Sequence, residues 1–387
     1  MEWIKKELQQ IKRQSLLRSL PEIEKKSGAR IKIRDRWLSN FCSNDYLGLA
    51  NDPRVISAGQ KALSKWGASA CASRLVSGNF SLHLELEEKL AKFKKTEACL
   101  VFPTGYLANL GAIRALVGRD DLVFSDELNH ASLIDACRLS RARVIIFPHS
   151  DINALERKLK NVRSRRRKLI VIEGIYSMDG DITLAQEILE VAEKFGAMVY
   201  LDEAHSTGVL GKRGKGCLEY FGIATPPKNL ILMGTLSKAL GSQGGFICCS
   251  KRMRDYLINT ARSFIFSTGL NPASIASALQ ALEVIEEEPE RIEKLRSNIA
   301  FARARLEKIG IKPGPDPTPI IPVILGGNEI TLRASQELFQ KGIFVQAIRP
   351  PSVPQNSSRL RITLSAAHTP KQISSLANAL AEFWESQ

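Results

Sequence analysis

The sequence has few aromatic residues and no cysteine spacing typical of a disulfide framework or a structural zinc site. Aromatic residues make up 6% of the 387 residues, and the seven cysteines are scattered without a C-x-x-C pair. This spacing argues against both kinds of site, and unpaired cysteines are typical of a reducing compartment. We therefore expect a cytoplasmic protein that binds no metal.

Long apolar runs of the kind found in signal peptides and membrane spans are also missing. The first residues, MEWIKKELQQIKRQ, form a charged amphipathic helical pattern without the apolar core of a signal peptide. The long uncharged stretch at residues 263–282 contains Ser267, Asn271, Pro272 and Gln280, and fits a loop and a buried helix better than a membrane span. We expect no association with a membrane.

Acidic residues are outnumbered, since 40 Asp and Glu stand against 55 Lys and Arg, and the formal net charge is +15. Such an excess could attract nucleic acid, an acidic small molecule or an acidic protein. Eight basic residues fall within residues 157–168, a run typical of a solvated helix end and loop. No zinc-finger spacing or RNA-binding signature accompanies the run, so we expect no nucleic-acid partner.

Most of the chain alternates apolar runs with helical patterns, which predicts an α/β fold. Apolar residues at three- and four-residue spacing predict helices such as residues 82–93 and 185–195. Runs that are apolar throughout suit strands buried on both faces of a mostly parallel sheet. The expected strands are Ala98–Phe102, Leu122–Ser125, Arg143–Phe147, Leu169–Glu173, Met198–Asp202, Leu230–Gly234 and Gly245–Cys249.

The composition changes after residue 272, where a long charged helical region leads to a proline-rich connector. We predict an N-terminal helix with two short strands at residues 1–45, a large α/β domain at 46–272 and a smaller C-terminal α+β domain at 273–387. The elements expected after residue 271 are helices at 272–309, 329–341 and 370–385 and strands at 320–325, 343–348 and 359–363.

Polar residues follow several predicted strands, at the position where open α/β sheets bind ligands. Asp202 ends one strand and Lys238 follows the next, ahead of the glycine-rich Gly241-Ser-Gln-Gly-Gly. A lysine beside a buried strand is costly unless it is paired or used covalently. A lysine for a Schiff base and an aspartate for a pyridinium nitrogen are the minimum that a protein contributes to pyridoxal phosphate (PLP) chemistry. The two residues together indicate a PLP enzyme.

Six motifs in order resemble the α-oxoamine synthases, PLP enzymes with the aspartate-aminotransferase fold. The likeness covers residues from about 15 to 385. It implies a PLP-dependent transferase of fold type I that joins an amino acid to an acyl thioester with loss of CO2. The motifs are Ser43-Asn-Asp-Tyr-Leu-Gly-Leu, Gly67-Ala-Ser-Ala with Ser73-Arg-Leu-Val-Ser-Gly, His130-Ala-Ser-Leu, Glu173-Gly-Ile-Tyr-Ser-Met-Asp-Gly, Asp202-Glu-Ala-His-Ser-Thr-Gly and Thr235-Leu-Ser-Lys-Ala-Leu-Gly.

The resemblance implies roles for individual residues around the cofactor. Lys238 would bind the PLP aldehyde and act as base and acid at the alpha carbon of the substrate. Asp202 would pair with the ring nitrogen, His205 would hydrogen-bond the phenolic oxygen, and His130 would stack on the ring beside the substrate. Further cofactor contacts are implied for the N-terminus of a helix and for two hydroxyl groups. These residues are Gly105 and Tyr106, and Thr235 and Ser177.

The resemblance places the substrates at a second set of residues. Arg361 would bind the amino-acid carboxylate with its planar fork, Asn44 would lie near substrate and cofactor, and Arg18 would meet the acyl group. We expect one of Arg359 and Arg361 to face away from the site. Relatives build each active site from two chains, which implies a homodimer in which Ser267-Thr268 reaches the phosphate of the neighbouring subunit.

Members of the family differ in their substrates. They join alanine to a pimeloyl thioester, glycine to succinyl-CoA or acetyl-CoA, or serine to a long acyl-CoA. The segment Ile348-Arg-Pro-Pro-Ser-Val-Pro is similar to the pimeloyl-using members, with Ser352 in place of their usual threonine. We therefore expect L-alanine and pimeloyl-CoA or pimeloyl-acyl carrier protein as substrates, in biotin biosynthesis. Glycine with acetyl-CoA is the alternative.

Two other classes of protein were weighed. A nucleic-acid-binding protein is suggested only by the charge, and it would bind no visible chromophore. A catalytically idle subunit of the same fold would be expected to lack the Schiff-base lysine, which this chain has at Lys238. With a PLP enzyme, the basic surface could instead attract CoA phosphates or an acidic carrier protein.

Overall fold

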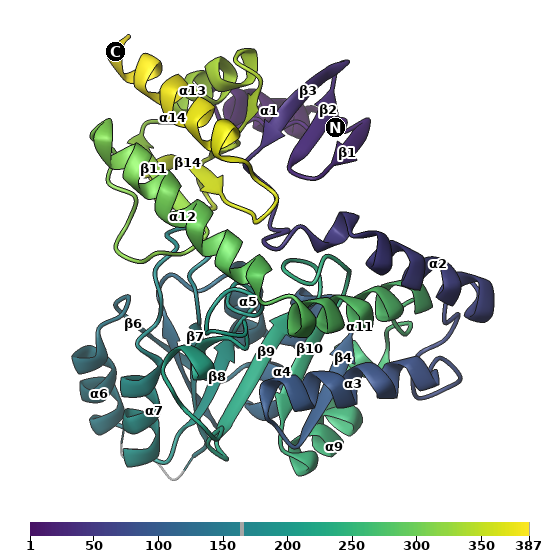
Figure 1. Ribbon diagram of the computed structural model, residues 1–387. Coiled ribbons are helices and arrows are strands. Elements are labelled where there is room, and N and C mark those ends of the chain that lie inside the picture. Colours follow the sequence, from purple (N-terminus) through teal and green to yellow (C-terminus); the bar gives the residue numbers. More distant parts are fainter. Residues whose placement is uncertain (163–165, 387) are drawn as a thin grey trace. The chain divides into compact units, whose positions relative to one another are not determined.

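The computed structural model describes residues 1–162 and 166–386, and contacts between Cα atoms divide the chain into two compact units (Figure 1). Unit 1 comprises Met1–Gly48, Met178–Asp181 and Glu293–Gln387, and unit 2 comprises Leu49–Ser177 and Ile182–Ile292. The N-terminal segment therefore belongs to the same unit as the C-terminal part of the chain. The domain boundaries after residues 45 and 272 stay predictions, and the divisions by contact come after residues 48 and 292.

Unit 2 is built on a seven-stranded, mostly parallel sheet, as predicted (Figure 1). The strand order is β4-β10-β9-β8-β7-β5-β6, in which β10 runs antiparallel to both of its neighbours and the other pairs are parallel. The seven strands predicted from apolar runs are confirmed with ends that differ by at most one residue. They are β4 (Ala98–Phe102), β5 (Leu122–Asp126), β6 (Arg143–Phe147), β7 (Lys168–Glu173), β8 (Met198–Asp202), β9 (Leu230–Thr235) and β10 (Gly245–Cys249).

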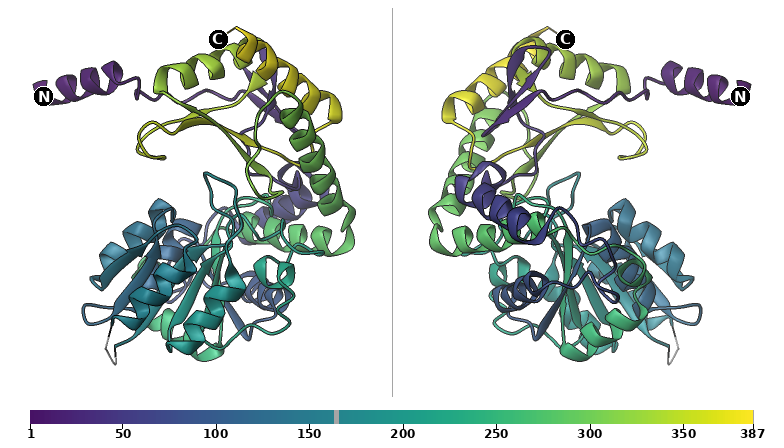
Figure 2. Two further views of the ribbon diagram at one scale, coloured as in Figure 1. Left: turned by 90° about the vertical axis from the view of Figure 1, so that its left-hand side faces the viewer. Right: turned by 90° about the vertical axis from the view of Figure 1, so that its right-hand side faces the viewer.

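Helices flank the strands of this sheet on both sides (Figure 2). One face packs against α4, α5 and α9 in a core that includes Leu116, Leu133, Leu257 and, from the sheet, Tyr200 and Met233. The helix α3 contacts β4 and β10, and α7 contacts β8. The helices of this part of the chain are α2 (Pro53–Trp66), α3 (Ser81–Lys94), α4 (Gly105–Leu116), α5 (Ala131–Ser140), α6 (Ile152–Lys160), α7 (Ala185–Lys194), α8 (Cys217–Tyr220), α9 (Lys251–Thr260), α10 (Arg262–Ile265) and α11 (Pro272–Glu287), with a 3-10 turn η1 at Leu49–Asn51.

Local sequence signals set the ends of several helices. Thr104 caps α4 by accepting a hydrogen bond from the Leu107 N–H, and Asn271 caps α11 ahead of Pro272. The helical region predicted at residues 272–309 is not one continuous helix. It consists of two helices, α11 and α12 (Glu290–Lys308). The break falls at Glu288-Pro289, where the proline disfavours helical backbone in the residue before it.

Unit 1 contains two small sheets with the orders β1-β2-β3-β12 and β11-β14-β13. Ile31, Ile33 and Leu38 form an apolar cluster against Phe339 and Phe344. The predicted strand at 343–348 is two short strands that pair with different sheets. The helix α1 has no buried residue and projects from the strands of its unit (Figure 2). The elements are α1 (Glu2–Arg13), β1 (Lys25–Ser27), β2 (Arg30–Ile33), β3 (Arg36–Asn40), β11 (Ile320–Gly326), α13 (Asn328–Gln340), β12 (Ile343–Phe344), β13 (Ala347–Ile348), β14 (Ser358–Thr363) and α14 (Pro370–Glu385).

Within residues 1–162 and 166–386, no helix is long and apolar enough to cross a membrane. The same residues contain no group of three or more His, Cys, Asp or Glu side chains that could hold a metal ion. Part of the basic run at 157–168, residues 163–165, lies outside the described residues.

Candidate active site

Seven of the eight predicted cofactor residues line one cavity of about 240 Å³ in unit 2. They come from the ends of different strands and the loops that follow, because the carboxyl ends of parallel strands meet at one edge of a sheet. The exception is Ser177, which is buried and whose backbone bonds to Glu173. The seven are Gly105, Tyr106, His130, Asp202, His205, Thr235 and Lys238.

Lys238 and His205 lie in direct contact in this cavity. The Lys238 Nζ is 2.7 Å from the His205 Nε2, although the two residues are 33 positions apart. Lys238 follows β9 and His205 follows the neighbouring strand β8, so the pairing of these strands brings the side chains together. An amine next to an imidazole can pass a proton to a ring nitrogen.

Asp202 is a nearly buried carboxylate with a specific set of donors. Its side chain is 5% exposed. Its Oδ1 accepts a hydrogen bond from the Ala204 N–H at 2.9 Å, and its Oδ2 accepts one from the Asn109 Nδ2 at 2.9 Å. These two donors fix the orientation of the carboxylate. Asp202 is therefore suited to face a protonated ring nitrogen.

His130 lies at the rim of the cavity as the N-cap residue of α5. Its Nδ1 accepts a hydrogen bond from the Ser132 N–H at 3.2 Å and is 2.8 Å from the Ser132 Oγ. Loss of hydration lowers the pKa of His130, the Lys238 charge acts in the same direction, and the Asp202 charge opposes both. We infer that the ring is neutral near pH 7 and carries its proton on Nε2.

Glu173 lines the cavity and was assigned no role from the sequence, although it begins one of the six motifs. It is 3% exposed and accepts hydrogen bonds from the backbone N–H groups of His130 and Ser177. Burial raises its pKa well above the ordinary range, and the nearby Asp202 charge adds to the effect. Glu173 thus holds the segments after β5 and β7 together without adding a second negative charge.

The start of α4 also lines the cavity. The first N–H groups of a helix have no partner inside the helix and suit a phosphate group. A Cβ on Gly245 would lie 2.5 Å from the Gly105 Cα, so close backbone packing requires glycine at 245, whereas a Cβ on Gly105 would meet only the flexible end of Met233 at 2.9 Å. The Thr235 hydroxyl bonds to the Gly244 carbonyl at 2.8 Å.

The donor set of the cavity fits PLP. Lys238 supplies an amine for the aldehyde, Asp202 a carboxylate for the ring nitrogen, and His205 a ring nitrogen for the phenolic oxygen. The start of α4 supplies N–H groups for the phosphate. Tyr106 contributes only its backbone to this set, because its hydroxyl donates to the carboxylate of Asp135.

Of the five predicted substrate residues, His130 lines the cavity of unit 2, and the other four are in unit 1, where they form two clusters. Arg361 donates to the Asn44 Oδ1 at 3.2 Å and to the Thr363 Oγ1 at 2.8 Å. Arg18 donates to the Pro350 carbonyl at 2.9 Å, and the Ser352 N–H donates to the Arg349 carbonyl at 3.1 Å. Arg18 therefore contacts the loop that carries Ser352.

The expectation that one of Arg359 and Arg361 faces away is wrong. Side chains two residues apart on a strand lie on the same face. The arginines differ in their partners instead, because Arg359 forms an ion pair with Asp179 and also binds the Met178 and Ser357 carbonyls. Arg359 is thus held by a structural ion pair.

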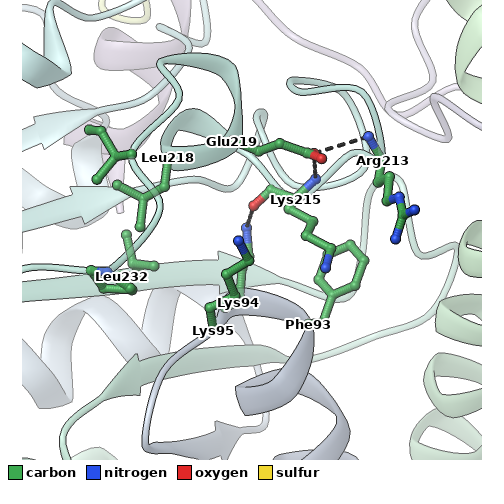
Figure 3. A pocket seen from close by; sticks show the side chains of 10 residues that line it. Phe93, Lys94, Lys95, Arg213, Lys215, Leu218, Glu219 and Leu232 are labelled. Atoms are coloured by element: carbon green, nitrogen blue, oxygen red, sulfur yellow. Dashed lines mark hydrogen bonds between the residues drawn. The ribbon is translucent and has the colours of Figure 1, made fainter.

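A second cavity in unit 2, of about 250 Å³, is lined by Lys94, Lys215 and Glu219 among others (Figure 3). The Lys94 Nζ is 2.7 Å from the Glu203 Oε2, and it also donates to the Lys215 carbonyl at 2.7 Å. The Glu219 carboxylate accepts hydrogen bonds from the backbone N–H groups of Arg213 and Lys215. These carboxylates organise the glycine-rich loop that follows His205.

Known proteins are similar to this chain over nearly its whole length. The family model for aminotransferase class I and II matches residues 38–380. A putative 8-amino-7-oxononanoate synthase of Desulforudis audaxviator is 47% identical over 384 residues, which cover 99% of each chain. The 8-amino-7-oxononanoate synthase of Thermosipho melanesiensis is 44% identical over 95% of this chain and 94% of its own.

Solved structures of two enzymes are also similar to this chain. A serine palmitoyltransferase from S. paucimobilis that holds a PLP–myriocin aldimine has a TM-score of 0.93 and 32% identity, with coverage of 99% of this chain and 97% of that chain. The 8-amino-7-oxononanoate synthase of Francisella tularensis has a TM-score of 0.77 and 27% identity, with coverage of 89% and 97%.

Proposed function

Because the chain belongs to the α-oxoamine synthases, a branch of the class I and II aminotransferase family, we propose that it joins L-alanine to a pimeloyl thioester. The products are 8-amino-7-oxononanoate, CO2 and the free thiol, a step of biotin biosynthesis. The observation that carries this substrate choice is identity of 42–47% over nearly the whole chain to relatives named for the reaction. The serine palmitoyltransferases share the fold at 30–33% identity.

The cofactor is PLP, whose ring, when bound, withdraws the electrons released at the alpha carbon of alanine. Lys238 takes the proton from that carbon. The carbon then bonds to the thioester carbonyl, and the carbon–sulfur bond breaks to release a thiolate, which takes a proton from the solvent. Loss of the carboxylate as CO2 follows, and Lys238 returns a proton to the same carbon. His205, in contact with the Lys238 Nζ, can hold a proton between these two transfers.

The other residues bind and orient. Asp202 would pair with the ring nitrogen, and neutral His130 would lie against the ring. In unit 1, Arg361 and its partner Asn44 bind the carboxylate of alanine. Ser352, and Arg18, which donates a hydrogen bond to the loop that carries Ser352, bind the acyl substrate.

We further propose that the enzyme is a cytoplasmic homodimer with shared active sites. Ser267-Thr268 would then reach the phosphate in the partner's cavity. Either pimeloyl-CoA or pimeloyl-acyl carrier protein is a suitable donor, because both are acidic and the chain carries a net charge of +15.

A coupled assay of the purified protein tests the proposal. Alanine and glycine are each offered with pimeloyl-, acetyl- and succinyl-CoA, and turnover is expected with alanine and the pimeloyl donor. Lys238→Ala should abolish turnover and the visible chromophore, whereas Lys212→Ala, a change at an exposed lysine, should alter neither. Product from glycine and a short acyl donor alone would overturn the substrate assignment.

A further inference from the structure

A buried amide lies behind the carboxylate of Asp202. Asn109, on α4, is 1% exposed. Its Nδ2 donates to the Asp202 Oδ2 at 2.9 Å and to the Ser132 Oγ at 2.8 Å. Its Oδ1 accepts from the Tyr200 hydroxyl at 2.8 Å. Both protons of the amide nitrogen and its carbonyl oxygen are thus engaged inside the protein.

The Tyr200 hydroxyl determines which way this amide points. Tyr200 is fully buried on β8, two residues before Asp202, so the two side chains share the face of the sheet that α4 covers. A hydroxyl that donates to the Oδ1 leaves the Nδ2 to face the carboxylate. The reverse orientation would set the amide oxygen against the Asp202 oxygen.

The same amide also reaches His130 through Ser132. Because the Ser132 Oγ accepts from Asn109, its own proton is available to the His130 Nδ1 at 2.8 Å. The Ser132 N–H donates to the same ring nitrogen. Asn109 therefore connects the predicted partner of the ring nitrogen with the residue predicted to stack on the ring.

We propose that Asn109 is a positioning residue that holds the Asp202 carboxylate aimed at the PLP ring nitrogen, with Tyr200 orienting its amide. The inference rests on the proposed role of Asp202. The Nδ2 donor offsets the cost of keeping a negative charge in a nearly buried place, and the pair of donors, Asn109 and Ala204, leaves the carboxylate one orientation. The Ser132 link keeps the proton of His130 on Nε2.

Binding of PLP to the apoenzyme gives a test that needs no substrate. Asn109→Ala should raise the dissociation constant of PLP about ten- to a hundredfold, as expected for loss of a charge-assisted hydrogen bond. It should also shift the pH titration of the visible band of the bound cofactor. Tyr200→Phe should act in the same direction but only severalfold, because it removes a neutral hydrogen bond.

Two further variants separate positioning from folding. Asn109→Asp keeps the shape but places a second carboxylate against Asp202, so it should weaken PLP binding more than Asn109→Ala does. Asn298→Ala is the matched control. Asn298 is 2% exposed and donates two hydrogen bonds of 2.9 Å, to the Ser365 and His368 carbonyls of unit 1. It should cost stability without shifting the cofactor titration.

The outcomes distinguish the two levels of the proposal. If Asp202→Ala weakens PLP binding but Asn109→Ala and Tyr200→Phe leave both the dissociation constant and the titration unchanged, the role of Asn109 is refuted and that of Asp202 stands. If Asp202→Ala also changes neither, both roles fall. Should Asn109→Ala not fold, Asn109→Ser and Tyr200→Phe provide the same comparison.

Discussion

Loss of Lys94 should destabilise unit 2 strongly without touching the cofactor cavity. The side chains of Lys94 and Glu203 are 1% and 0% exposed and their charged atoms are 2.7 Å apart. Lys94→Met removes the cation and leaves the Glu203 carboxylate buried with only uncharged donors from Cys217, its N–H at 2.6 Å and its thiol. Removing one partner of a buried pair costs about 3–5 kcal/mol.

The size of this loss comes from the charge left behind rather than from the attraction in the pair. Replacement of both partners by apolar residues of similar volume is often neutral or stabilising. Lys94→Met combined with Glu203→Leu should therefore recover part of the loss. Recovery will be incomplete by about 1–3 kcal/mol, because the Cys217 N–H and the Lys215 carbonyl lose their partners.

Urea denaturation followed by fluorescence and circular dichroism measures these differences. The matched control is Lys89→Met, on the same helix, where the Lys89–Glu283 pair has the same 2.7 Å separation but side chains 23% and 46% exposed. That change should cost at most about 1 kcal/mol. A loss below about 1 kcal/mol in Lys94→Met, or a double variant less stable than the single one, would refute the reasoning.

Three further predictions concern pH, substrate and salt. Burial lowers the pKa of His368 from 6.5 to about 4; the unfolded chain then binds the proton more readily, so this contribution to stability is full above about pH 6.5 and is lost toward pH 4. The loss should reach up to about 3 kcal/mol. Urea titrations at several pH values should show that the free energy of unfolding changes less steeply with pH in His368→Gln than in the unchanged protein. An equally steep dependence on pH would contradict the prediction. Arg361→Lys should raise the KM for alanine about ten- to a hundredfold with a smaller effect on kcat, because the planar fork is lost; steady-state kinetics with an unchanged KM would exclude the contact. The kcat/KM for pimeloyl-CoA and for pimeloyl-carrier protein should fall as salt rises, and no dependence for either donor would remove the proposed role of the +15 charge.

Much of the fold could be predicted because the responsible signals are local. Each strand of the large sheet is a short apolar run such as Ala98–Phe102, and strands of that kind between helices specify a parallel sheet. The break between the two helices at Pro289 also has a local signal, the proline itself, but the prediction did not include it. The predicted cofactor residues lie at strand ends or in motifs, and seven of the eight share a cavity for that reason.

The supporting residues carry no comparable signal. Asn109 lies in the helix that begins with the predicted site residues Gly105 and Tyr106, and Tyr200 is an ordinary strand residue two positions before Asp202. Their hydrogen bond joins residues 91 positions apart. Glu173 stands in a motif, but nothing in the motif says that its carboxyl group is buried with a raised pKa.

The chemistry that the protein can perform was determined by the sequence itself, because an amine, a carboxylate and two imidazoles at strand ends bring their reactivity wherever the strands place them. Only the tertiary structure decided which of these groups are buried, which donors hold them and which arginine of β14 is committed to an ion pair. Such properties depend on neighbours that the order of residues along the chain does not reveal. Hydrogen bonds and desolvation act over a few ångströms of space, whereas Lys238 and His205 are 33 positions apart in sequence and Arg359 and Asp179 are 180 apart.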